Sequence, residues 1–160
     1  REKLDKLISE FKNSNIKVLS FFNSSFGELG TISNKANESF KNFSRFNIQE
    51  FDKKDVSLIL ITKFKSSFEK ILIRGYNVPK HLINKCERYL TNSFDIIAIS
   101  DVVVAVPGCS VVFQAAQSGC KVMIYDFEGE NDKLRPLENK YCFTRVTKFR
   151  ETIRKLSLVL

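Results

Sequence analysis

The segment from residue 101 to residue 126 constrains the fold of this chain more than any other part of the sequence. An apolar, mostly β-branched run over 102–106 is typical of a strand that is buried on both faces. A Pro-Gly pair stops this strand, and a helix is predicted over 111–117, which Gly119 ends in a left-handed conformation. A second buried strand follows over 121–125. Two such strands joined by a helical crossover form a right-handed parallel βαβ unit.

The rest of the chain continues this alternation of strands and helices. Apolar spacing predicts an amphipathic helix over 2–13, within a leading helical segment 1–15. Further strands are predicted over 16–22, over 56–62 and, as short pieces, at 89–90 and 141–143, and further helices over 33–45, 67–73, 79–88, 94–100 and after Thr147. The pattern predicts an α/β fold: a single doubly wound, Rossmann-like parallel sheet with helices on both faces, formed by residues 1–160.

The charge of the chain excludes some partners and permits others. The net charge is +8, but lysines and arginines are scattered without a dense run, which favours a solvated surface and argues against nucleic-acid binding. A surplus of this sign is compatible with peripheral association with an anionic membrane at its inner face. No apolar run approaches the roughly 20 residues needed to span a bilayer. No signal peptide opens the chain, so we expect a cytoplasmic protein.

The titratable and nucleophilic residues form no recognisable catalytic or metal motif. The four cysteines are far apart, and the single histidine is His81, so we expect no metal site and no cofactor. The dinucleotide fingerprint and the P-loop are both absent. No pair of a nucleophile and a base is visible, and we assign no catalytic residue.

Ligands of open parallel sheets bind beyond the carboxyl ends of the strands. Four loops follow predicted strands and carry residue types suited to an anionic ligand: 23–30, 62–66, 107–110 and 126–135.

The loop at 107–110 is the strongest of these candidates. Gly108 lets the backbone approach a ligand closely, and the free amides of Ser110, Val111 and Val112 at the helix start suit a phosphate. The alternative is that Ser110 only caps the helix and Gly108 only turns the chain, as every βαβ unit requires.

The neighbouring loops offer further contacts. Lys63 and Lys65 either neutralise a diphosphate or are solvated surface lysines. The loop after the first strand is either an ordinary polar connection or a phosphate- and sugar-contacting segment, and its candidates are Ser24, Ser25, Gly27 and Glu28.

Residues 99–126 resemble the donor-binding half of GT-B glycosyltransferases, closest to those of bacterial capsule and surface-polysaccharide synthesis. The resemblance lies in an aspartate before an apolar strand, a small-residue loop, a helix with an acidic residue before Ala, a Gly, and a strand ending in Tyr-Asp; here these are Asp101, Gly108-Cys109-Ser110, Gln114-Ala115, Gly119 and Tyr125-Asp126. The order of elements extends the resemblance to about 16–150, including the loop from Phe22 to Glu28.

The resemblance implies a function and a set of residue roles. Gly108, Cys109, Ser110 and Val111 would bind the donor diphosphate, Lys63 and Lys65 would assist the leaving phosphate, and Gln114 would contact the ribose and base. Gln114 stands where the family has Glu, and Phe64-Lys65-Ser66 stands where it often has Pro-His-Pro.

The resemblance also implies a larger assembly. The chain would be the C-terminal half of a longer two-domain protein whose preceding half binds the acceptor, a polysaccharide or lipid-linked glycan. Two alternatives remain open: a nucleotide-sugar 2-epimerase, which shares the pattern, and a non-catalytic nucleotide-binding or interaction module.

Overall fold

The computed structural model describes most of the predicted strands and helices. The described residues are 2–22, 56–64, 70–105, 111–125, 144–146, 151 and 154–156. The predicted helix over 33–45 lies outside them.

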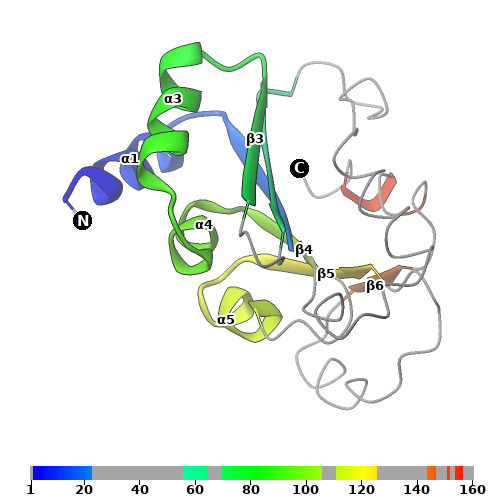
Figure 1. Cartoon of the computed structure of the whole chain (residues 1–160). Coiled ribbons are helices and arrows are strands. Elements are labelled where there is room, and N and C mark those ends of the chain that lie inside the picture. Colours follow the sequence, from blue (N-terminus) through cyan, green and yellow to red (C-terminus); the bar gives the residue numbers. More distant parts are fainter. Residues whose placement is uncertain are drawn as a thin grey trace.

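The described strands form one six-stranded sheet (Figure 1). Its order is β3-β2-β1-β4-β5-β6, and the strands are β1 (Lys17–Phe22), β2 (Leu58–Phe64), β3 (Lys70–Tyr76), β4 (Val102–Ala105), β5 (Lys121–Tyr125) and β6 (Thr144–Val146). All neighbours are parallel except β2 and β3. The chain therefore builds outward from β1 in one direction and then returns to add β4 on its other side, as in doubly wound folds.

Described helices cover one face of the sheet and a short C-terminal helical segment lies against the other, which confirms the predicted α/β class (Figure 1). One face carries α1 (Glu2–Lys12), α3 (Lys80–Tyr89), α4 (Ser93–Ile99) and α5 (Val111–Gln117). Their buried side chains share a cluster with Val18, Ile61 and Val103. Leu156, from the C-terminal helical segment, packs in a second cluster with Phe21 and Val104 on the opposite face.

Alternating side chains of the central strands divide the core into these two clusters. In β2, Ile59 and Ile61 belong to the cluster under the four helices, whereas Leu58 and Leu60 belong to the cluster with Leu156. All four are fully buried. A strand covered on both faces needs apolar residues at every position, and this explains the continuous apolar runs in the sequence.

Several predicted boundaries are accurate, because local signals set them. Helix α5 and strand β5 match the prediction residue for residue, and Gly119 has a positive φ of 85° just after α5. Glycine tolerates this conformation because it has no Cβ.

Two local predictions are wrong. Residues 67–73 were predicted as a helix, but β3 occupies Lys70–Tyr76 and pairs antiparallel with β2. The apolar run Lys-Ile-Leu-Ile is compatible with both a helix and a strand, and pairing along the edge of β2 selects the strand. The predicted short strand at 89–90 is also wrong, because α3 extends to Tyr89 and the amide of Leu90 donates to the Cys86 carbonyl at 2.9 Å.

Polar groups tie the amino ends of three strands together. The Asp101 carboxylate accepts a hydrogen bond from the Val18 amide at 2.8 Å. The Asp101 amide donates to the Val18 carbonyl at 2.9 Å, and its carbonyl accepts from the Lys121 amide at 3.1 Å. Asp101 therefore joins β1, β4 and β5 at their start.

A buried hydroxyl pair connects β1 to the end of α4. Ser20 is fully buried, and its hydroxyl lies 2.5 Å from that of Ser100. The Ser100 hydroxyl donates its one proton to the Ile96 carbonyl at 2.6 Å. Ser20 must then donate to Ser100, since each hydroxyl carries a single hydrogen. These two hydrogen bonds satisfy the hydroxyl of Ser20, the polar residue that interrupts the apolar run of β1.

The two described cysteines are packing residues with protonated thiols. Burial, with lesser contributions from Glu87 and Glu10, raises the pKa of the Cys86 thiol to about 12. The Cys120 thiol contacts the Ser100 carbonyl at 3.2 Å, and burial together with the nearby Asp101 carboxylate raises its pKa as well. Cys120 is partly buried and packs against the helix-side core.

Candidate functional site

The carboxyl ends of the central strands lie level with one another at one edge of the sheet. Phe22 of β1 pairs with Lys63 of β2 on one side and with Ala105 of β4 on the other. Ala105 in turn pairs with Ile124 of β5. The strand order reverses between β1 and β4, so this edge is the topological switch point at which open α/β sheets bind ligands.

Lys63 is the candidate site residue whose side chain the structure places most clearly. It lies inside β2 rather than past its end, and only 8% of its surface is exposed. Its ammonium donates to the hydroxyl of Ser93, the first residue of α4, at 2.6 Å. The solvated alternative is therefore wrong for Lys63. Its register opposite Phe22 directs it into the helix-covered face.

Helix α5 carries the other described candidates. The Val111 side chain is buried, with 6% exposed, so only its backbone amide is suited to contact a ligand. Gln114 lies one turn farther along and is half-buried. The remaining candidates lie outside the described residues, and their roles stay predictions: Ser24, Ser25, Gly27, Glu28, Lys65, Gly108, Cys109 and Ser110.

The first turn of α4 is held by reciprocal side-chain caps. The Asn92 side chain accepts a hydrogen bond from the Asp95 amide at 3.0 Å. The Asp95 carboxylate reaches back to Thr91, accepting from its amide at 3.3 Å and from its hydroxyl at 3.1 Å. The Asn-x-x-Asp spacing resembles a capping box, and it is the local feature of the sequence that could have indicated this turn.

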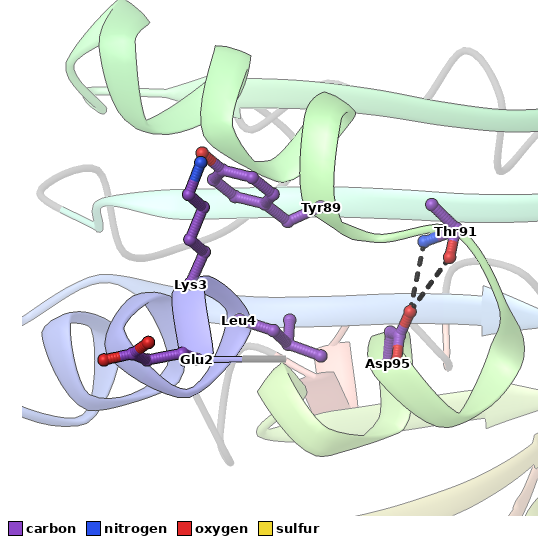
Figure 2. Close-up of a pocket in the computed structure, with 6 residues that line it drawn as sticks. All are labelled: Glu2, Lys3, Leu4, Tyr89, Thr91 and Asp95. Carbon is purple, nitrogen blue, oxygen red and sulfur yellow. Dashed lines mark hydrogen bonds between the residues drawn. The ribbon is translucent and has the colours of Figure 1, made fainter.

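A pocket of about 530 Å³ opens beside this turn (Figure 2). Residues from the start of α1, the end of α3 and the first turn of α4 line it: Glu2, Lys3, Leu4, Tyr89, Thr91 and Asp95. Sequence reasoning missed this pocket because its two halves are more than 80 residues apart and neither half is a motif.

The part of the chain that the structure describes contains no metal-binding cluster and no membrane-spanning helix. Within those residues, no group of three or more His, Cys, Asp or Glu side chains is arranged to hold a metal ion. His81 is exposed on α3. Among the described helices, none has the length and apolar character to cross a membrane.

Comparison with protein-family models, with curated proteins and with solved structures finds no match for this chain.

Proposed function

We propose that this chain is the donor-binding domain of a glycosyltransferase and that it binds a nucleotide-activated sugar for bacterial surface-polysaccharide synthesis. One observation carries the proposal. The ends of β1, β2 and β4 lie level at the point where the strand order reverses. Sheets of this type bind nucleotides in the crevice outside that point.

Lys63 supports a role for this edge in binding an anion. An ammonium group that is mostly withdrawn from water acts more strongly on a nearby negative charge than a solvated one. The Ser93 hydroxyl fixes its position at 2.6 Å. In the proposed reaction, Lys63 and the amides at the start of α5 stabilise the negative charge that develops on the departing diphosphate.

The position of Gln114 is consistent with a ribose-binding role. It lies one turn into α5, half-buried, on the helix that follows the predicted phosphate loop. Its amide can both donate and accept hydrogen bonds with sugar hydroxyls.

The proposal also specifies where the protein works. The acceptor is a polysaccharide or a lipid-linked glycan, and the half that binds it supplies the catalytic base. We place the protein in the cytoplasm, and its net charge of +8 supports peripheral association with the anionic inner face of the membrane.

Calorimetric titration with UDP-, GDP- and CMP-sugars tests the proposal. We expect one nucleotide class to bind, and both Ser110→Ala and Lys63→Met to weaken binding by tenfold or more. Lys85→Ala is the matched control, since Lys85 is exposed on α3 and pairs with Glu10. Circular dichroism establishes that each variant is folded. Failure of every donor to bind the wild-type chain would reject the proposal.

Two other outcomes would identify the alternatives. Epimerised sugar, formed from donor without any acceptor, would indicate the 2-epimerase. Weak nucleotide binding combined with steeply salt-dependent binding of a polyanion would indicate a non-catalytic module.

A further inference from the structure

We propose that the outer edge of β3 is a dimer interface, at which two copies of this chain pair their β3 strands antiparallel about a two-fold axis at Ile73. This inference does not depend on the proposed function. The described sheet ends at β3 on one side, and β2 is its neighbour on the other (Figure 1). Alternate residues of an outer strand direct their backbone amides and carbonyls away from the sheet, so such an edge is a template for another strand.

The two outer strands of the described sheet differ in how they resist such pairing. At the far edge, β6 is three residues long and has Arg145 at its centre. Short strands and central charges are two ways in which proteins prevent pairing between sheet edges. In contrast, β3 has seven residues, contains no proline, pairs with β2 along its whole length without a bulge, and has Ile-Leu-Ile in succession over 71–73. Of these two edges, β3 is therefore the one suited to pairing.

The side chains of β3 keep part of their apolar surface exposed. Ile71 and Ile73 pack against the helix-side core but are only half-buried. Leu72 lies on the opposite face of the strand, is also half-buried, and is not among the side chains that pack against either cluster of the described core. A second strand would cover this surface, because directly opposite side chains of an antiparallel pair have Cβ atoms about 5 Å apart.

The charges of β3 select one register for a symmetric pair. The axis must pass at a residue, because successive antiparallel pairs alternate between hydrogen-bonded and non-hydrogen-bonded types. An axis at Leu72 would place Lys70 opposite Arg74, and an axis at Arg74 would place that residue opposite itself. Like charges in direct opposition are destabilising, and axes nearer the strand ends pair fewer residues. An axis at Ile73 pairs all seven residues: Ile73 with itself, Leu72 with Arg74, Ile71 with Gly75, and Lys70 with Tyr76.

The symmetry of this pairing favours a second copy as the occupant. Each copy uses the same patch, and pairing consumes the β3 edge of both, so the assembly closes as a dimer and does not grow into a filament. The axis is perpendicular to the sheet. The two sheets therefore become one continuous sheet, with the helix-covered faces of both copies on the same side.

Sedimentation velocity of the whole chain, from about 1 µM to about 200 µM, tests this inference. We expect a reversible equilibrium between monomer and dimer. Leu72→Lys places an ammonium group opposite Arg74 of the partner subunit, and we expect the dissociation constant to rise tenfold or more. Leu72→Glu also loses the apolar side chain but places a carboxylate there, so it should dimerise at least tenfold more tightly than Leu72→Lys. Equal dimerisation by the two variants overturns the proposal.

Cysteine crosslinking tests the register independently. Ile73→Cys places two thiols opposite each other at the axis, whereas residue 71 would lie about 14 Å along the strands from its own copy. Mild oxidation should then give a reducible covalent dimer with Ile73→Cys, and no more than the wild-type level with Ile71→Cys, because a disulfide cannot span that distance. The wild type accounts for the native cysteines, and circular dichroism establishes that each variant is folded. Equal crosslinking by both variants, or by neither, overturns the proposal.

A chain that stays monomeric at every concentration also overturns the proposal. Amide hydrogen exchange of that monomer would then identify the other occupant of the edge. Slow exchange of every β3 amide would mean that another segment of the same chain covers the strand, and fast exchange at alternate residues would mean that the edge is open to a different protein.

Discussion

The two ends of the sheet use their polar groups differently. At the amino end, Asp101 joins three strands through its carboxylate and backbone, and the Cys120 thiol contacts the Ser100 carbonyl. At the carboxyl end, Lys63 reaches across from β2 to Ser93 of α4. The amino end therefore connects neighbouring strands, whereas the carboxyl end connects a strand to a helix start beside the proposed ligand edge.

This difference implies that stability and binding can be separated. A change at the amino end removes hydrogen bonds between strands and should lower the free energy of unfolding without altering donor affinity. A change at the carboxyl edge should lower donor affinity without altering the free energy of unfolding, unless it removes a buried hydrogen-bond partner. The loss of stability caused by a core substitution in the middle of the sheet provides the scale for the losses expected at the two ends.

The largest effect is expected in that middle. Ile61 is fully buried in β2 beneath the helices, so Ile61→Ala removes contacts and leaves a cavity. We expect it to lower the free energy of unfolding by about 2–5 kcal/mol in urea denaturation. The matched control, Lys85→Ala on the surface, should change it by less than about 0.5 kcal/mol. Similar values for both variants would show that the two sheet faces are not a packed core.

The next largest effect is expected at the amino end of the sheet. Asp101→Ala leaves the amide of buried Val18 without its carboxylate acceptor, which lies at 2.8 Å. The expected loss is about 1–3 kcal/mol in the free energy of unfolding, with donor affinity unchanged. Asp101→Asn keeps an acceptor oxygen and should recover more than half of that loss. If Asp101→Ala weakened donor binding tenfold in a folded protein, the separation of the two ends would be wrong.

The sequence predicted the sheet well where local chemistry decides. Gly119 and the buried runs of β4 and β5 act through backbone conformation and burial, and both are properties of a short segment. The prediction was less accurate where pairing decides. Strand β3 depends on the free edge of β2, and the segment Lys70–Tyr76 does not reveal that edge.

The candidate site was predicted only in outline. The strand-end rule predicted Lys63 near the carboxyl ends of the strands without reference to tertiary contacts, and the structure has it in the last residue pair between β1 and β2. It could not indicate that Lys63 is buried, because that depends on its register opposite Phe22 and on the position of Ser93. The pocket lined by Tyr89 and Asp95 forms only where α1 packs against α4, and no local sequence pattern predicts that packing.

A third prediction concerns pH and the helix layer, away from both ends. Burial raises the pKa of the Cys86 thiol to about 12, above its ordinary value of 9.0. As pH rises through 9, the unfolded chain loses this proton before the folded chain does, so stability falls. Cys86 contributes at most about 1.4 kcal/mol of this fall per pH unit.

Denaturation at pH 8 and pH 10 checks this prediction. Cys86→Ala is less stable than the wild type at pH 8 because of its cavity, but its stability should fall by less on going to pH 10. An equal fall in both proteins would mean that the Cys86 thiol titrates normally in the folded state.

The smallest expected effect lies at the carboxyl edge and tests the other half of the comparison. Gln114→Glu places a carboxylate where the amide is proposed to contact the ribose, and hydrogen bonds to a charged acceptor are stronger. Isothermal titration should show donor binding about threefold to fivefold tighter, which corresponds to less than about 1 kcal/mol. Gln114 is half-buried at the middle of α5, and Glu has nearly the same size and shape as Gln, so the free energy of unfolding should change little. Gln114→Leu, of similar size, is the matched control and should weaken binding. If Glu and Leu weakened binding equally, residue 114 would not contact the ribose, and the donor would lie elsewhere along the edge.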